Sequence, residues 1–246
     1  KLSRRGPSLP QNNPDNVNVP PFETEDLRAS LATFLDTPFD DPSGSKVKIG
    51  NYKWGVYGFF DYDGEPIYVG QTNEMVRTRI RRHLTNQRTD AVAMSVLDPF
   101  EVFEIEIWPL PQFQETPKSD AAARQHLNAL EREITERAIL RSEFKAILNE
   151  KDPPPGDLEV GVPLSMRASI VSQRVRELRS HPDFRIARRA LIVSRLAQVI
   201  SERKVQGGLR RVLLIQAKRL QWLAERRYQA LGGARSVESE GTEEAE

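Results

Sequence analysis

Two short strand-like runs joined by a tight-turn signal most constrain how this 246-residue chain can fold. The run from Tyr52 to Phe60 and the shorter run 67–69 are both rich in aromatic and β-branched residues, so both are predicted to be strands. The segment 61–66 between them contains the Asp-Gly pair that is typical of a hairpin turn. The sequence therefore predicts two neighbouring antiparallel strands, each carrying a tyrosine.

An arginine-rich helix is expected directly after this hairpin. Gly70 is expected to end the second strand, and a helix is expected at about 75–84, capped by the Thr-Asn-Glu triplet before it. Met75, Arg79 and His83 are spaced four residues apart, so they share one face of that helix. The hairpin and the helix can therefore bring two phenols, a guanidinium and an imidazole to one point.

The motifs Gly55-Val56-Tyr57 and Tyr68-Val69-Gly70 resemble the pair that gives the GIY-YIG endonuclease family its name, with valine in place of isoleucine in both. The resemblance covers the catalytic domain only. It implies an α/β fold of the α+β type, with a small antiparallel three-stranded central sheet flanked by helices. It also implies a metal-dependent hydrolysis of phosphodiester bonds in DNA.

The resemblance also implies a role for each of these four side chains. Tyr57 would be the general base, which is demanding because a free phenol has a pKa of about 10. The charge of Arg79 and the imidazole of His83 are expected to lower that barrier or to pass the proton onward. Arg79 would also donate two hydrogen bonds to the phosphate oxygens, and Tyr68 would orient the water and the phosphate.

A carboxylate for a divalent cation is implied on a later helix, which apolar periodicity places at about 121–142. Glu131 lies at the edge of the apolar stripe, Glu133 lies well around the helix, and Glu136 points away from the stripe. The side-chain direction favours Glu131. Glu136 remains the alternative, because it precedes Asn149 by 13 residues, nearer to the family's spacing than the 18 residues from Glu131.

Asn149 resembles the asparagine that closes the family's final strand and braces the site. Oxygen ligands and a phosphate substrate favour Mg²⁺, with Mn²⁺ as the alternative cation. A zinc site is not supported, since the chain has no cysteine and its three histidines, at positions 83, 126 and 181, have no ligand spacing. The sequence also lacks a glycine-rich phosphate-binding loop.

The composition divides the chain into four segments. We expect an N-terminal arm and short helix at 1–46, the nuclease domain at 47–155, a basic helical module at 156–235 and an acidic disordered tail at 236–246. No apolar run approaches the length of a membrane span, and cysteine is absent, so a cytoplasmic protein is expected. A homodimer is left open.

The net charge of +1 conceals a strong asymmetry. Residues 166–235 hold seventeen Lys or Arg against four Asp or Glu, whereas the last eleven residues hold five glutamates and no base. A basic helical region suits phosphate backbones, although a basic oligomerisation module is the alternative. The exposed side of the last helix is expected to carry Arg219, Arg226 and Arg227, together with the expected DNA contacts Arg210, Arg211 and Lys218. The full set of expected DNA contacts is Gln71, Arg82, Arg88, Arg210, Arg211 and Lys218.

The run 100–108 alternates apolar and acidic residues and is predicted to be a strand, with a bulge between residues 103 and 104. The preferred function is a DNA endonuclease of restriction or another genome-defence system. Two alternatives stay open: a catalytically inactive DNA-binding protein with this fold, and a nuclease of structured RNA.

Overall fold

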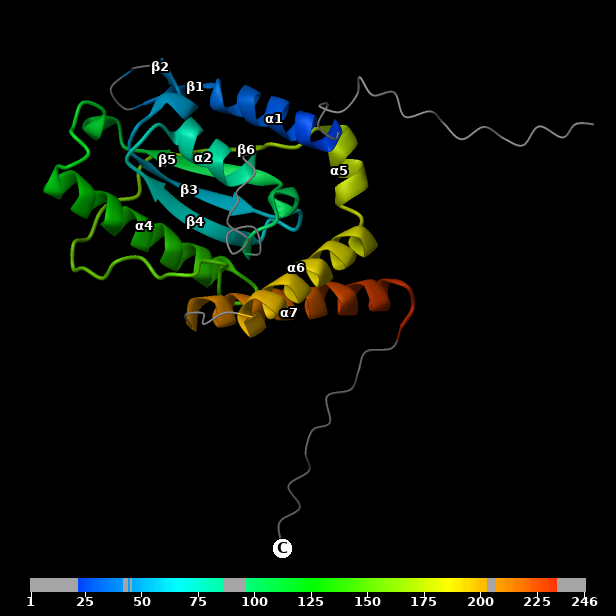
Figure 1. The fold of residues 1–246 in the computed structure, drawn as a ribbon. Coiled ribbons are helices and arrows are strands. Elements are labelled where there is room, and N and C mark those ends of the chain that lie inside the picture. Colours follow the sequence, from blue (N-terminus) through cyan, green and yellow to red (C-terminus); the bar gives the residue numbers. More distant parts are fainter. Residues whose placement is uncertain (1–21, 42–43, 45, 86–95, 203–206, 234–246) are drawn as a thin grey trace, which may run out of the picture.

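The computed structural model describes residues 22–41, 44, 46–85, 96–202 and 207–233 (Figure 1). The expected arm at 1–21, the proposed DNA contact Arg88 and the acidic tail 236–246 lie outside the described residues. No helix in the described ranges is long and apolar enough to cross a membrane.

The central sheet has four antiparallel strands in the order β4-β3-β5-β6. Its strands are β3 (Gly55–Phe60), β4 (Pro66–Thr72), β5 (Glu104–Pro109) and β6 (Met166–Ser169). A separate two-stranded sheet pairs β1 (Pro38–Asp40) with β2 (Lys46–Lys48). The mixed α+β class with an antiparallel sheet is confirmed, but the central sheet has a fourth strand beyond the three expected. The expected boundary at residue 155 does not separate the sheet from the rest of the chain, because β6 pairs with β5.

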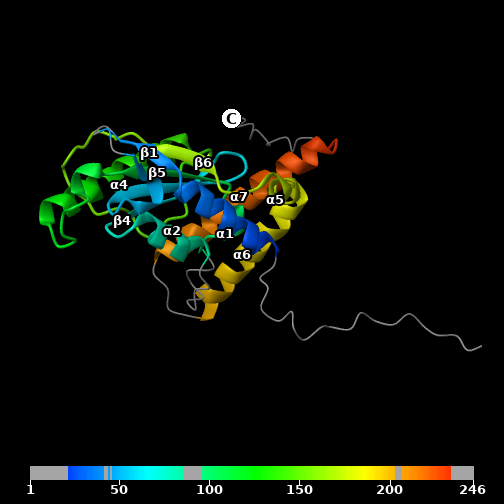
Figure 2. The ribbon, with the colours of Figure 1, turned by 90° about the horizontal axis from the view of Figure 1, so that it is seen from above.

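Helices cover both faces of this sheet (Figures 1 and 2). Tyr57 and Phe59 of β3 pack with α1 and α2, whereas Val56 and Trp108 pack with α4 on the opposite face. Helices α6 and α7 pack against each other and join the core on the α1 and α2 side. The α-helices are α1 (Phe22–Leu35), α2 (Val76–Leu84), α4 (Ala121–Arg141), α5 (Gln173–Arg179), α6 (Pro182–Glu202) and α7 (Gly207–Ala230). In the part of the chain that the structure describes, the short 3₁₀ turns are η2 (Ile49–Asn51), η3 (Pro99–Glu101) and η4 (Pro111–Phe113).

Three local predictions need correction. The strand expected at 100–108 begins only at Glu104, because the carboxylate of Asp98 accepts from the Phe100 N–H and starts the 3₁₀ turn η3. Strand β4 continues through Gly70 to Thr72. Helix α2 has Met75 as its N-cap without a side-chain capping bond, since the Thr72 hydroxyl accepts from a backbone N–H before the helix.

The arginines of α6 and α7 are partly used inside the fold. Asp61, in the turn between β3 and β4, is 1% exposed, and its Oδ2 accepts from Arg189 Nη2 at 2.9 Å and from Arg219 Nη2 at 2.6 Å. Arg185 Nη2 reaches the same oxygen at 3.4 Å and Asp63 at 2.6 Å. Arg219 was expected on the exposed side of α7, so that prediction is wrong. Part of the positive charge of residues 166–235 therefore neutralises buried carboxylates.

Candidate active site

A cavity of about 450 Å³ lies at the edge of the sheet beside β4. Strand β4 contributes Tyr68, helix α2 contributes Arg79 and His83, and helix α4 contributes Glu131. Gln71, Asn149 and the segment 150–154 complete its wall. Residues that are distant in sequence, and that lie on both sides of the sheet, thus meet in one cavity.

Tyr57 lies behind this cavity and does not line it. Its side chain is fully buried, its hydroxyl lies 3.2 Å from Nε2 of His83, and Nε of Arg79 donates to the same hydroxyl at 3.3 Å. Its ring stacks on that of Tyr68, with 6.2 Å between the ring centroids. Tyr57 therefore links the three side chains that face the cavity.

Burial shifts the pKa of Tyr57 in the direction opposite to the one expected from the neighbouring Arg79 charge. Burial raises the pKa of the Tyr57 phenol well above its ordinary value, and the charge and hydrogen bond of Arg79 only partly offset that rise. Tyr57 is therefore a neutral phenol near neutral pH. A role as a free phenolate base, which the resemblance implied, does not fit this environment.

Gly70 allows the tyrosines to meet at the edge of the sheet. A Cβ added at Gly70 would lie 2.7 Å from the Tyr57 hydroxyl oxygen and 2.8 Å from Cε1 of Tyr68, closer than real Cβ atoms approach. Any larger residue would therefore displace one of the two rings. The glycine of the second motif serves close packing inside β4, whereas the sequence had suggested a strand end.

Glu131 reaches the cavity from α4, on the far side of β4 from α2. Burial raises the pKa of its carboxyl to about 7, against the opposing effect of the Arg79 charge. No hydrogen bond from the described residues reaches this carboxylate. On the same helix Glu136 is exposed, and Glu133 pairs with Arg137 at 2.6 Å. Glu131 is thus the one of the three competing glutamates that faces the cavity.

The possible metal ligands in this cavity fit a Mg²⁺ ion that takes most of its ligands from water and phosphate oxygens and few from the protein. Within the described ranges, no group of three or more His, Asp or Glu side chains is placed to enclose a metal. Mg²⁺ usually keeps several waters and binds through one or two carboxylates plus phosphate oxygens. A desolvated carboxylate without a hydrogen-bond donor, such as that of Glu131, suits this mode of binding.

Asn149 braces the free edge of β4 with its side chain. Its Oδ1 accepts from the Val69 N–H at 3.2 Å, and its Nδ2 donates to the Val69 carbonyl at 2.7 Å. The neighbouring Leu148 N–H donates to the Ile67 carbonyl at 2.8 Å. Residues 146–149 form no strand, contrary to the expectation, because one backbone bond and one amide side chain replace the ladder.

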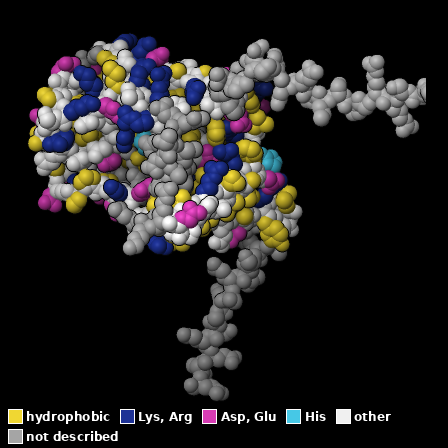
Figure 3. Space-filling model, in the orientation of Figure 1, with side chains coloured by type: hydrophobic (Ala, Val, Ile, Leu, Met, Phe, Trp, Pro, Cys, Tyr) yellow, Lys and Arg dark blue, Asp and Glu magenta, His cyan; other side chains and the backbone are white. Residues whose placement is uncertain are grey.

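The side chains that were expected to contact DNA differ in whether they already bind another residue of the fold. Gln71 donates to Oδ1 of Asn128 at 2.9 Å, and Arg82 pairs with Glu74 at 2.9 Å. Arg210 and Lys218 are exposed, and none of the described residues pairs with them. Arg211 donates hydrogen bonds to the segment 149–152. On the face of the molecule that carries α2, Lys and Arg side chains gather at the surface (Figure 3).

Two residues near the cavity, Asn128 and Lys151, are not among those predicted from the sequence. Asn128 lies three positions before Glu131 and therefore on the same face of α4, so helical periodicity could have found it. Lys151 lines the cavity from an irregular segment, for which the sequence carries no periodic signal.

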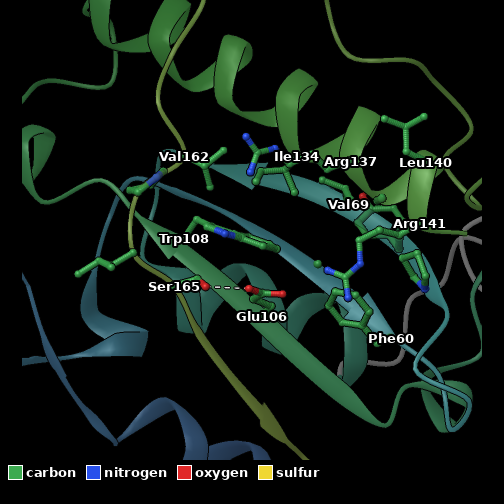
Figure 4. A pocket seen from close by; sticks show the side chains of 16 residues that line it. Phe60, Val69, Glu106, Trp108, Ile134, Arg137, Leu140, Arg141, Val162 and Ser165 are labelled. Atoms are coloured by element: carbon green, nitrogen blue, oxygen red, sulfur yellow. Dashed lines mark hydrogen bonds between the residues drawn. The ribbon is translucent and has the colours of Figure 1, made fainter.

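A larger cavity of about 650 Å³ lies on the opposite face of the sheet, under α4 (Figure 4). Its walls are mainly apolar and include Phe60, Trp108 and Val162, and its polar groups include Glu106, which accepts from Ser165 Oγ at 2.7 Å. Arg79, His83 and Glu131 do not line it. Of these two cavities, only the smaller one brings Arg79, His83 and Glu131 together.

A family model of the GIY-YIG catalytic domain matches residues 53–135. This match confirms the resemblance read from the two tyrosine motifs and indicates the GIY-YIG nuclease superfamily for this part of the chain. The matched range includes both tyrosines, Arg79, His83 and Glu131, and it ends before Glu136 and Asn149. No curated protein and no solved structure matches the chain.

Proposed function

We propose that this protein is a Mg²⁺-dependent endonuclease that hydrolyses phosphodiester bonds in DNA. The observation that carries the proposal is the meeting of Tyr68, Arg79, His83 and Glu131, from three different elements, in one cavity at the edge of the sheet. A phenol, a guanidinium, an imidazole and a carboxylate can together supply the proton transfer, charge stabilisation and cation binding that phosphodiester hydrolysis requires.

Arg79 would bind the scissile phosphate. Its Nε is held by the Tyr57 hydroxyl, which leaves the terminal nitrogens to donate to the non-bridging oxygens. Glu131 would hold Mg²⁺, which supplies stabilisation of the negative charge that develops on the phosphate and the leaving oxygen. Tyr68, whose ring centroid lies 5.4 Å from that of His83, would orient the phosphate.

His83 would accept the proton of the attacking water. It lines the cavity, and its Nε2 lies 3.2 Å from the hydroxyl of the neutral Tyr57. A neutral imidazole titrates in the range in which a general base is effective, whereas a buried phenol does not. Tyr57 would therefore orient the imidazole and Arg79 together.

The test is nicking of supercoiled plasmid in Mg²⁺ by the wild-type protein and by Glu131→Gln, with Glu136→Gln as the matched control on the same helix. We expect Glu131→Gln to lower the rate at least about 100-fold, because the group that holds the cation is lost. Glu136→Gln should cut at the wild-type rate, since that side chain is exposed.

Equal rates for wild type and Glu131→Gln would contradict the assignment of the metal ligand. If the wild-type protein retards DNA but does not cut it with Mg²⁺ or Mn²⁺, the protein is a DNA-binding protein with this fold. If it cuts structured RNA and leaves DNA intact, the substrate is RNA.

A further inference from the structure

We infer that the first turn of α7 is a brace for the active site, and that Arg211 is a positioning residue within it and does not contact DNA. The inference rests on the proposed function for its cleavage readout only. The brace acts on the segment 149–154, which forms one wall of the catalytic cavity.

Arg211 makes three hydrogen bonds to this segment. Its Nη1 donates to the Asp152 carboxylate at 3.0 Å, and its Nη2 donates to the carbonyls of Asn149 at 3.2 Å and Glu150 at 3.4 Å. A guanidinium engaged with a carboxylate and two carbonyls has few donors left for a phosphate. The neighbouring Arg210 is exposed, and no described residue pairs with it, so it is the better candidate for a DNA contact.

Gly208 fixes the same segment by backbone packing. A Cβ added at Gly208 would lie 2.0 Å from the carbonyl oxygen of Glu150, so only glycine permits this approach. Leu209 and Val212 are buried in the same apolar cluster as Leu148, which anchors both segments. This contact does not depend on charge and is not screened by solvent.

Asn149 connects this segment to β4, the strand that carries Tyr68. Its backbone carbonyl accepts from Arg211, while its side chain makes two hydrogen bonds to Val69. Val69 lies between Tyr68 and Gly70, the residues that shape the cavity. A shift of residues 149–150 would therefore move β4 at the point where the two tyrosines meet.

The brace affects the positions of the active-site residues more than the stability of the fold. Arg211 is 42% exposed and Asp152 is 79% exposed, and exposed ion pairs of this kind contribute little to the stability of a fold. A misplacement of about 1 Å in an active site, in contrast, can lower a rate about 100-fold. Loss of Arg211 should therefore lower the catalytic rate without unfolding the protein.

The experiment compares two adjacent pairs of variants, Arg211→Ala with Arg210→Ala and Gly208→Ala with Gly207→Ala. A Cβ at Gly207 meets nothing within 4 Å, so Gly207→Ala is the control for the clash at Gly208. Each full-length variant is assayed for single-turnover cleavage at saturating protein, for DNA affinity and for thermal unfolding. We expect Arg211→Ala and Gly208→Ala to lower the saturated rate about 10- to 100-fold at unchanged affinity.

Amide hydrogen exchange of Val69, followed by NMR in the absence of DNA, tests the brace without any cleavage. Because Asn149 accepts from this N–H, Arg211→Ala should speed its exchange at least about fivefold, and Arg210→Ala should not. Unchanged Val69 exchange in Arg211→Ala together with weaker DNA binding would overturn the inference and return Arg211 to the DNA contacts. A wild-type protein that cuts no DNA would refute the proposed function and leave the exchange result valid.

Discussion

At the scale of single residues, burial decides the chemistry of side chains that look equivalent in sequence. Glu131 and Glu136 lie on one helix, yet of these two only Glu131 faces the cavity. Burial there raises the pKa of the Glu131 carboxyl to about 7. Tyr57 and Tyr68 are the tyrosines of the two paired motifs, yet Tyr57 is fully buried and Tyr68 lines the cavity. The raised pKa values of Glu131 and Tyr57 therefore follow from the burial of these two side chains.

The raised pKa of Glu131 predicts a pH dependence of stability in metal-free buffer. Its pKa is about 7 in the folded protein, above the ordinary value of 4.5, so between these values the folded chain binds more protons than the unfolded chain. The free energy of unfolding should therefore fall as the pH rises through this window. Glu131→Gln should flatten this fall and raise Tm at pH ~8, measured against wild type by thermal unfolding at several pH values. Parallel curves for the two proteins would contradict the prediction.

At the scale of elements, one side chain replaces a strand at the edge of the sheet. Asn149 pairs with both backbone groups of Val69, as the backbone of a neighbouring strand would. Strand β6 completes the opposite edge from a segment that is far along the chain. The ends of the sheet are therefore set by segments that the hairpin motif does not specify.

The amide of Asn149 predicts the effect of an isosteric change. Asn149→Asp keeps the shape but loses the donor and places a second acceptor against the Val69 carbonyl. The free energy of unfolding in urea should fall by about 1–3 kcal/mol, because a buried carbonyl loses its partner. Asn51→Asp is the control, since among the described residues the Asn51 side chain only accepts a hydrogen bond, from Nε of Arg77. An equal loss in both variants would show that the added charge, and not the missing donor, is responsible.

At the scale of the whole molecule, a buried ion network joins the C-terminal helices to the hairpin. Asp61 lies in the hairpin turn, and Arg185, Arg189 and Arg219 converge on its Oδ2. Arg189 also donates to Glu101 at 2.8 Å. Because these groups are buried, the helices α6 and α7 are an integral part of the fold around the catalytic sheet.

Removal of the Asp61 charge should be strongly destabilising. Asp61→Asn would leave buried guanidinium groups without their shared carboxylate, which typically costs about 3–5 kcal/mol in the free energy of unfolding. Asp183→Asn breaks the pair with Arg227, in which Asp183 is 55% exposed, and should cost far less because solvent screens this pair. Urea denaturation of the two variants measures the difference. A loss for Asp61→Asn as small as that for Asp183→Asn would contradict a stabilising role of the network.

The sequence by itself determined the features that depend on near neighbours along the chain. These are the hairpin and the helix that places Arg79 and His83 one turn apart. Turn residues and a repeat of 3.6 residues are local signals, so a single sequence reveals them.

Only the tertiary structure decided which polar side chains are buried and which backbone segments meet. The contact of Arg219 with Asp61 spans 158 positions, and that of Asn149 with Val69 spans 80. Helical spacing places Arg219 on the same face of α7 as the buried Val212 and Leu223, but its charge gives no local sign that the side chain is buried there. Its role follows from the packing of α7 against the sheet, which brings this guanidinium to a buried carboxylate and leaves other cations of the helix in water.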